Sequence, residues 1–332
     1  MSTNTECCAA YSDDCKLLAY SSPDGRLQIW DTDAGTLKQE YVPSSHLSAA
    51  ATCLSWRAQT AAPRHRKQRS RSAGGGGDGP LLALGTPAGS VLVYSVVAGD
   101  LQTELSGQHA GAVHCLAWDA AGGHVFSGGA DAHALQWAVG KGRVKCKLKA
   151  GKTAVHSVCP LPDGSSLLTA SRTITWWELA SGAQLRTYAG HPGEVTCLRH
   201  VPLQLTRDET HQAASVSFAL PSEARDVRVR AEAADGAVLV TAVTTDGLLH
   251  VFERHLNGVR KKPVRPKLTV RVATEGAAPR QLPVLAARPG AEQPARLHLC
   301  HGSFLRPTFE RLVSAGIGRV RVGQPPGGPG RG

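Results

Sequence analysis

Two copies of one unit follow each other over residues 108–178, and this repeat constrains the fold more than any other feature of the chain. Val113 in the first copy matches Val155 in the second at a spacing of 42 residues, and Trp137 matches Trp177 at a spacing of 40. A period of this size, built from short alternating segments, is typical of arrays in which each unit is a four-stranded sheet. The repeat therefore predicts an all-β chain in the form of a β-propeller, with one blade per unit.

The first copy contains the strands and turns of one blade. Residues 113–118 alternate in the pattern of a strand, and a Gly-Gly pair then supplies a turn. Two further strands are predicted over residues 124–128 and 134–139. The fourth is predicted over residues 141–149, where cations alternate with smaller or apolar residues; the cations are Lys141, Arg143, Lys145, Lys147 and Lys149. This alternation predicts an outermost strand with one face in water.

An aromatic residue marks the end of the third strand in most units. These aromatic residues are Trp30, Tyr94, Trp137, Trp177, Phe252 and Phe309. Trp30 is followed by Asp31, which completes the signature dipeptide of WD repeats. The unit that begins at Val195 has no such aromatic, and the next unit begins only 32 residues later, at Val227. The predicted fold is therefore a seven-bladed WD-repeat β-propeller over residues 11–315 with an incomplete fifth blade.

Both ends of the chain lie outside the predicted propeller. Residues 1–10 and the Gly- and Pro-rich residues 316–332 are predicted to be disordered. The N-terminal residues have neither a basic start nor an apolar core, so no signal peptide is expected. Because no apolar run approaches the roughly 20 residues that cross a bilayer, the sequence predicts a protein of the cytosol or nucleus without membrane contact.

The nine cysteines fit such a compartment. Cys53, Cys115 and Cys197 recur at one position of the repeat, and each is followed by Leu. We expect them to be small apolar core residues that form no disulfide.

The net charge of +11 is concentrated in three segments. The first is a Gly-rich insert at residues 63–80, which must loop out between the first and second strands of the second blade; its cations are Arg64, Arg66, Lys67, Arg69 and Arg71. The second is the predicted outer strand at 141–149. The third contains Arg260, Lys261 and Lys262, followed by Arg265, Lys267 and Arg271. Because phosphate backbones bind such segments through counterion release, they are candidate contacts for RNA or acidic partners.

Each charged segment also has a simpler interpretation. Lysines protect an outer strand against pairing with other sheets, which alone would explain residues 141–149. The insert could be a solvated loop or a nuclear-targeting signal. Its GGGGDG run lacks the Lys-Ser/Thr of a phosphate-binding loop, which favours a flexible linker.

Six segments of the chain are more specific than the repeat alone: LQIWD, QEYVPSSHLS, LLALGTPAGSVLVYS, SRTITWWEL, HLNGVRKKP and GSFLRPTFERL. In this order they resemble the WD repeat-containing protein 43 family, whose members are propeller subunits of the small-subunit processome. The resemblance covers about residues 10 to 315. It implies a nucleolar scaffold that acts in pre-ribosomal RNA transcription and in maturation of small-subunit RNA. Its implied partners are other WD-repeat and helical subunits of the processome and pre-ribosomal RNA, with no small-molecule substrate.

The sequence departs from this family in two places. Family members have a complete fifth blade, whereas most of its later strands are missing between His200 and Val227. They also continue into a helical C-terminal domain and an acidic tail, whereas this sequence stops at Gly332. By resemblance, the sequence is therefore expected to be a truncated form.

In WD repeats, a His in the entry loop, an Asp in a turn and a Trp at a strand end form a structural hydrogen-bond network. The residues expected to serve it are His109, Asp131, Trp137, Trp30, Asp31 and Trp177. With Ser127 nearby they also suggest a Ser-His-Asp hydrolase, but the sequence has no nucleophile elbow. The histidines show neither an HxH nor an HExxH pattern. We therefore predict no catalytic, metal or cofactor site.

A second function class fits the same fold. A propeller can read peptides, as the substrate receptor of a ubiquitin ligase or as a chromatin reader. Such a reader needs an aromatic or arginine-lined mouth on the axis of the ring, and the sequence alone does not place one.

Overall fold

The computed structural model describes the backbone of the following residues: 8–22, 24–42, 50–58, 79–189, 193–198, 220, 224–231, 237–244, 248–255, 265–266, 268–271, 284–287, 296–303, 306–314 and 320–323. The chain divides into two compact units. The first comprises Met1–Asp31 and Thr36–Leu198, and the second comprises Thr32–Gly35 and Arg199–Gly332.

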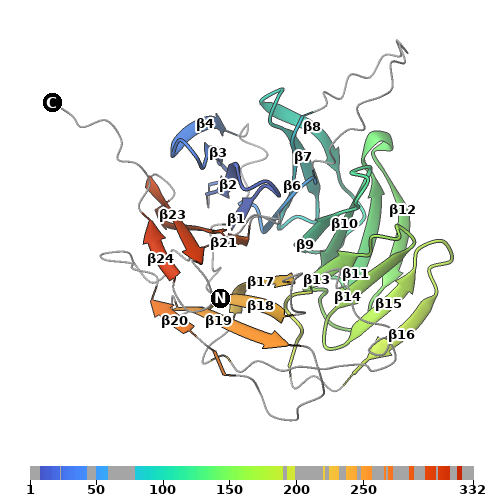
Figure 1. The fold of residues 1–332 in the computed structure, drawn as a ribbon. Helices are drawn as coiled ribbons and strands as arrows, with labels where there is room; N and C mark the ends of the chain where they lie inside the picture. The colour runs from blue at the N-terminus through green and yellow to red at the C-terminus, as the bar shows by residue number, and fades with distance from the viewer. Residues whose placement is uncertain are drawn as a thin grey trace, which may run out of the picture. The chain divides into compact units, whose positions relative to one another are not determined.

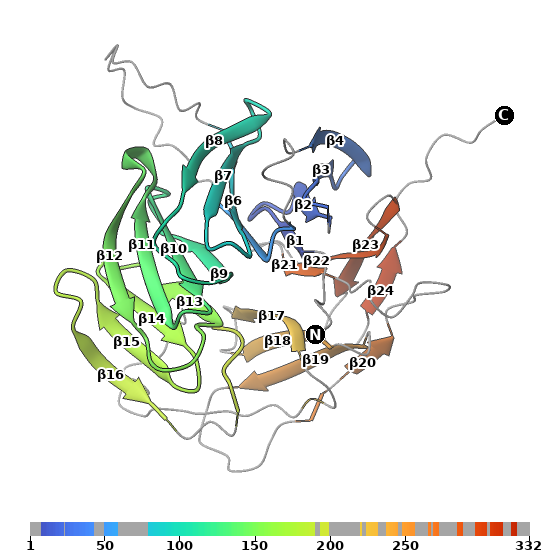
Figure 2. The ribbon, with the colours of Figure 1, turned by 180° about the vertical axis from the view of Figure 1, so that it is seen from behind.

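The described strands of the first unit form four antiparallel sheets, each built from four consecutive strands (Figures 1 and 2). The first sheet contains β1 (Cys8–Tyr11), β2 (Leu17–Ser21), β3 (Leu27–Asp31) and β4 (Thr36–Tyr41). The second contains β5 (Cys53–Trp56), β6 (Leu81–Gly85), β7 (Val91–Ser95) and β8 (Asp100–Leu105). The third contains β9 (Val113–Trp118), β10 (His124–Gly129), β11 (His133–Ala138) and β12 (Arg143–Lys149), with the short 3-10 helix η1 (Val139–Lys141) before β12. The fourth contains β13 (Ser157–Pro160), β14 (Ser166–Ala170), β15 (Ile174–Glu178) and β16 (Gln184–Tyr188).

The turn between β9 and β10 shows how local sequence ends one strand and starts the next. Gly122 has a φ of +69°, which residues with a Cβ rarely adopt. Its N–H donates to the carbonyl oxygen of Asp119 at 3.0 Å. The Asp119 carboxylate in turn accepts the N–H of His124 at 2.9 Å. The predicted Gly-Gly turn is therefore confirmed, and it positions His124 as the first residue of β10.

The four sheets pack face to face through apolar side chains. The first strands β1, β5, β9 and β13 contact one another in sequence, and β4, β8, β12 and β16 are the outermost strands of their sheets (Figure 1). Each pair of consecutive sheets shares one hydrophobic cluster. In the second cluster, the buried Trp137 belongs with Leu81 and Val93 of the preceding sheet. The core of the first unit therefore lies between sheets.

Glycine allows the close approach between neighbouring sheets. A Cβ atom on Gly128 of β10 would lie 2.6 Å from the Sγ atom of Cys115 and 2.6 Å from the Cγ1 atom of Val155. Gly85 occupies the same place in the preceding sheet, where a Cβ atom would lie 2.5 Å from the Sγ atom of Cys53. Real Cβ atoms do not approach other atoms this closely, so both positions require glycine.

The second unit contains two further four-stranded antiparallel sheets among its described residues. One consists of β17 (Ala224–Ala231), β18 (Ala237–Thr244), β19 (Leu248–His255) and β20 (Leu268–Arg271). The other consists of β21 (Val284–Ala287), β22 (Arg296–Ser303), β23 (Arg306–Ser314) and β24 (Val320–Gly323). Val240, Ala242 and Phe252 form a small core in the first of these sheets.

The predicted all-β fold of four-stranded antiparallel sheets is confirmed. All six predicted aromatic positions fall on the third strand of a sheet: they lie on β3, β7, β11, β15, β19 and β23. Val227, the predicted start of a unit, lies on the first strand β17. Most of the blade predicted between Val195 and Val227 lies outside the described residues, and residues 193–198 form no strand.

The structure corrects three predicted boundaries. β1 begins at Cys8, inside the segment predicted to be disordered, because residues 8–11 pair with β2 and bury Tyr11. β24 lies inside the tail that was also predicted to be disordered; Val320 and Val322 give it a strand pattern, and it pairs with β23. The fourth strand of the third sheet begins at Arg143, because Lys141 ends η1 and Gly142 takes a φ of +60°.

The cysteine prediction is confirmed in part. Cys53, Cys115 and Cys197 each carry a thiol that forms no disulfide. Burial is the main cause that raises the pKa of Cys53 to about 12 and the pKa of Cys115 well above its usual range. Cys197, however, is exposed, so its predicted place in the core is wrong. The described residues around Cys197 form no strand that could carry its side chain into a sheet interface.

Candidate functional site

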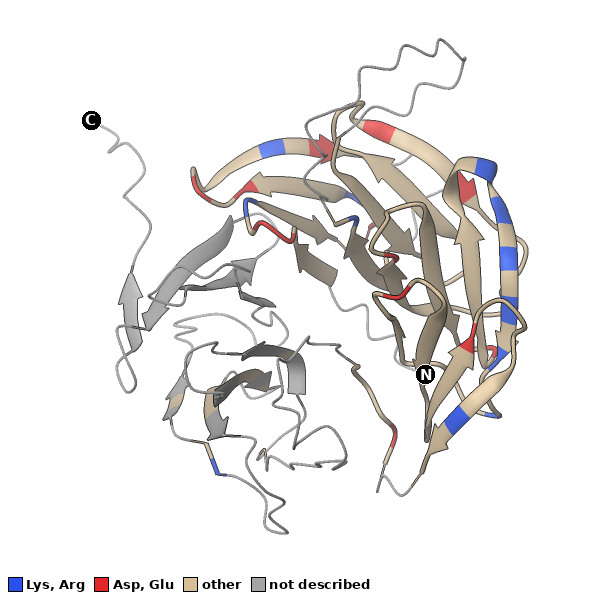
Figure 3. Cartoon of the chain, turned by 45° about the vertical axis from the view of Figure 1, so that its right-hand side comes forward, with Lys and Arg blue, Asp and Glu red and all other residues tan. Residues whose placement is uncertain are grey.

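The outer strand β12 carries a row of exposed cations. Its residues alternate between exposed and covered positions, with the exposed positions held by Arg143, Lys145, Lys147 and Lys149. Val144 and Cys146 between them are half-buried, and Leu148 is buried. Figure 3 shows the cations as a blue band along the outer edge of the first unit. We refer to these four residues as the β12 stripe.

The charges of the β12 stripe are not neutralised by nearby acids. In the part of the chain that the structure describes, no carboxylate lies within 4.0 Å of any of the four cations. Lys147 has one fixed contact, in which its Nζ atom donates to the backbone carbonyl oxygen of Gln108 at 3.1 Å. Among the described residues, the stripe therefore presents positive charge without a paired acid.

The outer strands of the other sheets in the first unit differ from β12 in charge. β8 carries Asp100 and Glu104, whereas β4 carries Lys38 and Glu40. β16 carries a single cation, Arg186. A row of cations is therefore particular to β12 among the outer strands of the first unit.

The other two basic segments lie mostly outside the described residues. This holds for Arg64, Arg66, Lys67, Arg69 and Arg71 of the insert and for Arg260, Lys261, Lys262 and Lys267. The insert connects β5 to β6, which pair with each other, so its predicted place between the first and second strands of the second sheet is confirmed. In the third segment, Arg265 is exposed and Arg271 is the last residue of β20.

The predicted network in the third sheet is present, and it also includes Ser127. The Nδ1 atom of His109 lies 3.0 Å from the Oδ1 atom of Asp131, and its Nε2 atom lies 2.8 Å from the Oγ atom of Ser127. Trp137 donates its Nε1–H to the same Ser127 oxygen at 2.8 Å. The Ser127 hydroxyl can therefore donate to His109, which leaves the Nδ1–H of His109 for Asp131.

Backbone donors hold the acidic end of this network. The carboxylate of Asp131 accepts the N–H of Ala110 at 3.1 Å and the N–H of His133 at 3.2 Å. Although burial opposes ionisation, these hydrogen bonds, together with His109, keep the pKa of Asp131 below its usual value. Burial lowers the pKa of His109 despite the opposing effect of Asp131, so the imidazole is neutral at neutral pH.

The network cannot act as a hydrolytic triad in the folded chain. Ser127 is fully buried, at 0% exposure, so no substrate carbonyl can reach its Oγ atom. That oxygen is also occupied by Trp137 and His109. The arrangement joins β10 and β11 to the loop before β9, which is a structural role.

The other predicted network residues have simpler partners. Trp177 donates its Nε1–H to the Oγ1 atom of Thr169 at 2.9 Å, and Trp30 donates its Nε1–H to the Oε1 atom of Gln28 at 3.2 Å. Asp31 is half-buried at the end of β3. The sequence analysis did not identify Thr169 and Gln28, although Thr169 occupies the position of its unit that corresponds to Ser127.

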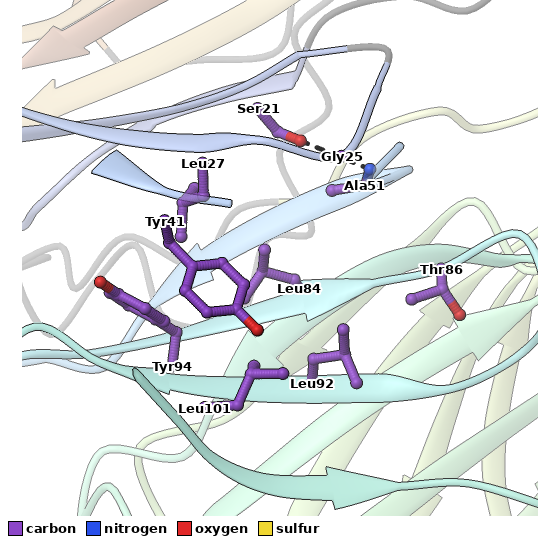
Figure 4. A pocket seen from close by; sticks show the side chains of 10 residues that line it. All are labelled: Ser21, Gly25, Leu27, Tyr41, Ala51, Leu84, Thr86, Leu92, Tyr94 and Leu101. Atoms are coloured by element: carbon purple, nitrogen blue, oxygen red, sulfur yellow. Dashed lines mark hydrogen bonds between the residues drawn. The ribbon is translucent and has the colours of Figure 1, made fainter. Parts of the chain in front are cut away.

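The first and second sheets enclose a small apolar cavity of about 20 Å³. Tyr41 and Tyr94 lie against it with ring centroids 5.3 Å apart (Figure 4). A space of this size holds about one water molecule. It is too small to bind a substrate or cofactor.

No group of three or more His, Cys, Asp or Glu side chains that could hold a metal ion occurs in the described residues. Two histidines do gather at the start of β9 and β13: the rings of His114 and His156 lie 5.7 Å apart. The Nε2 atom of His156 lies 3.0 Å from the Oε2 atom of Glu194. The residues that the structure describes contain no helix that is both long and apolar enough to span a membrane.

Comparison with known proteins agrees with this architecture. The family model "WD domain, G-beta repeat" matches residues 4–31 and 99–137. The chain is 34% identical to WD repeat-containing protein 43 of Homo sapiens over 335 residues, which covers 89% of this chain and 49% of that protein.

The chain is a WD-repeat protein and a homologue of WD repeat-containing protein 43. It spans about half the length of that relative. Among solved structures, a chain in "Crystal Structure of Mitotic Checkpoint Complex" is 17% identical with a TM-score of 0.47, over 90% of this chain and 72% of that one. The two matches of the WD family model fall on β1 to β3 and on β9 to β11 with the segment that precedes them.

Proposed function

We propose that this WD-repeat protein is a non-catalytic scaffold of the small-subunit processome in the nucleolus. It acts there in transcription of pre-ribosomal RNA and in maturation of small-subunit RNA. The observation that carries this proposal is the 34% identity to WD repeat-containing protein 43, which extends over 89% of the chain. Its partners in this role are other WD-repeat and helical subunits of the processome, and pre-ribosomal RNA.

The proposed scaffold is a seven-bladed ring in which the fifth blade is short. Six four-stranded sheets with an aromatic residue on each third strand support this arrangement. The unit that starts at Val195 supports it as well, because the N–H of Val195 donates to the carbonyl oxygen of Ser171 at 2.7 Å. Rigid sheets of this kind suit a protein that holds others in place, since their exposed faces and edges remain available for contacts.

RNA contact is assigned to the insert at residues 63–80 and to the cluster at Arg260, Lys261 and Lys262. Both segments are rich in cations and carry no acidic residue beside them except Asp78. Binding of phosphates to such segments releases counterions, so it weakens steeply as salt rises.

The test is a change of Arg64, Arg66, Lys67, Arg69 and Arg71 together to Gln in the full chain. We expect less ribosomal RNA to co-purify at low salt, with a shallower dependence on salt concentration, and weaker nucleolar accumulation in cells. Unchanged RNA recovery together with unchanged nucleolar placement would show that the insert has no such role.

A further inference from the structure

The β12 stripe lies on an edge strand. This placement suits a partner that forms main-chain hydrogen bonds with β12 and also carries charges opposite to those of the stripe. Among the described strands, β12 pairs only with β11, so its other edge is open. Such an edge presents main-chain N–H and C=O groups that can form a ladder with an added strand. A cation cluster on a loop would offer charge without this ladder.

Two of the cations have the spacing of an added strand. Residues i and i+2 of a regular strand lie about 7 Å apart on one face, and Lys147 and Lys149 occupy such positions opposite Leu135 and His133 of β11. The register of the pair shifts between Gln136 and Trp137, so Lys145 lies at a bulge and Arg143 lies beyond it. An extended partner with acidic residues at every second position would place carboxylates opposite Lys147 and Lys149. Opposite charges across paired strands stabilise the pair, whereas like or absent charges do not.

The apolar residues between the cations contribute to the same match. Cys146 is half-buried at the margin of the third cluster, whereas Val144 packs against the second cluster. Small apolar or β-branched residues between the acidic residues of the partner would extend this margin. A nucleic acid would use the cations but would leave both the open edge and this margin without partners. β12 also carries no aromatic side chain on which a base could stack.

We propose that β12 binds an acidic, extended protein segment, which adds to the third sheet as a further strand. The lysines then have two effects. They disfavour pairing with neutral strands and with other edges, as edge cations do, and they favour a strand that brings the complementary charge. This proposal goes beyond the assigned RNA contact, which concerns other residues.

The experiment measures binding of the full chain to a synthetic peptide in which four Glu alternate with Thr. A control peptide has the same four Glu with Pro in place of each Thr, so it carries equal charge but loses half of its N–H donors and does not form a regular β-strand. We expect the Glu-Thr peptide to bind at least about tenfold more tightly than the Glu-Pro peptide. We also expect it to slow amide hydrogen exchange within residues 143–149.

Two protein variants with the same change in net charge separate the stripe from bulk electrostatics. Lys145→Glu with Lys149→Glu alters the stripe and leaves the Lys147 contact with Gln108 intact. Lys38→Glu with Arg186→Glu makes the equal change on β4 and β16. We expect only the first variant to lose binding of the Glu-Thr peptide, by about tenfold or more. Circular dichroism and the urea midpoint establish that both variants are folded.

Three outcomes would overturn the proposal. Equal binding of the two peptides would show that charge alone is recognised. Equal loss in the two variants would show that the stripe is not the site. The third outcome concerns an oligouridylate. If its binding depends on Lys145 and Lys149, if it displaces the Glu-Thr peptide, and if the β12 amides are not protected, the stripe is assigned to RNA.

Discussion

The third and fourth sheets carry a tryptophan at the same position but hold it in different ways. Trp137 shares the Ser127 oxygen with a histidine that is bonded to an aspartate, whereas Trp177 bonds to Thr169. The reason lies in the hairpin between the second and third strands. In the third sheet, five residues, including the aspartate, connect Gly128 to its pairing partner Ala134. In the fourth sheet, three residues connect Ala170 to its pairing partner Ile174.

This difference separates what the repeat requires from what one copy has added. Both sheets bury the indole ring against the preceding sheet and give its N–H an oxygen acceptor. Only the third sheet connects that acceptor to the loop before its first strand, through His109. The ring and its acceptor are therefore the common element of the repeat, and the His-Asp connection is an addition that the longer hairpin makes possible.

The largest effect is expected from truncation of the shared element. Trp137→Ala should lower the free energy of unfolding by about 3–5 kcal/mol, because Trp137 is fully buried and its removal leaves a cavity between two sheets. Trp177→Ala should cost less, since Trp177 is slightly exposed, whereas each variant loses one indole hydrogen bond. Urea unfolding followed by circular dichroism measures both. A larger loss for Trp177→Ala would show that the deeper burial of Trp137 does not set the cost.

The acceptor oxygens provide a finer comparison. Ser127→Ala leaves the buried Nε1–H of Trp137 and the Nε2 atom of His109 without their partner, and should cost about 2–3 kcal/mol. Thr169→Val removes a single acceptor and keeps the shape of the side chain, so it should cost about 1–2 kcal/mol. Equal losses in the urea midpoints would show that the histidine does not depend on Ser127.

The sequence predicted the repeated parts of the fold better than the parts that occur once. Trp30, Tyr94 and Phe309 could be assigned to third strands because each repeats a position that the other units define. The start of β1 and the strand β24 were missed, since pairing with the neighbouring strand of a hairpin, rather than local composition, decides that these segments are strands.

The site could be predicted to a similar extent. His109, Asp131 and Trp137 were predicted to share a network, and the structure brings them together through Ser127. Thr169 was missed because its hairpin is shorter than that of the third sheet, which shifts the spacing between acceptor and tryptophan from ten residues to eight. The alternation at residues 141–149 predicted an outermost strand, whereas the comparison of its charge with β4, β8 and β16 required the sheet order of the structure.

The third sheet should also respond to pH in a way that the fourth does not. Burial lowers the folded-state pKa of His109 below its usual 6.5, so the unfolded chain binds the proton more readily. This contribution to stability is fully present above about pH 6.5 and is lost as the pH falls toward the folded-state value. One proton changes the free energy of unfolding by at most about 1.4 kcal/mol per pH unit. His114 shifts in the same direction, through burial and then His156, and adds to the slope.

His109→Gln tests this dependence. Urea midpoints measured from pH 7.5 to 5 should fall less steeply for the variant than for the natural chain. The groups that face His109 are Asp131, Lys147 and His133, and Asp131 stays ionised over this range because its pKa is lowered. An identical slope in the two proteins would show that His109 is not the group that titrates.

The smallest effect on stability is expected at the outer strands, where the third sheet also differs from its neighbours. Lys145→Thr with Lys147→Thr should change the free energy of unfolding by no more than about 0.5 kcal/mol, since both side chains are exposed. The same variant should self-associate at concentrations where the natural chain does not, because a neutral strand with β-branched residues pairs readily with another edge. Light scattering after size-exclusion chromatography measures this. Lys38→Thr on β4 is the control, since that strand retains Glu40 and had no row of cations to lose. If both variants remain monomeric, the cations of β12 are not needed to keep that edge apart from others, and their function is confined to binding.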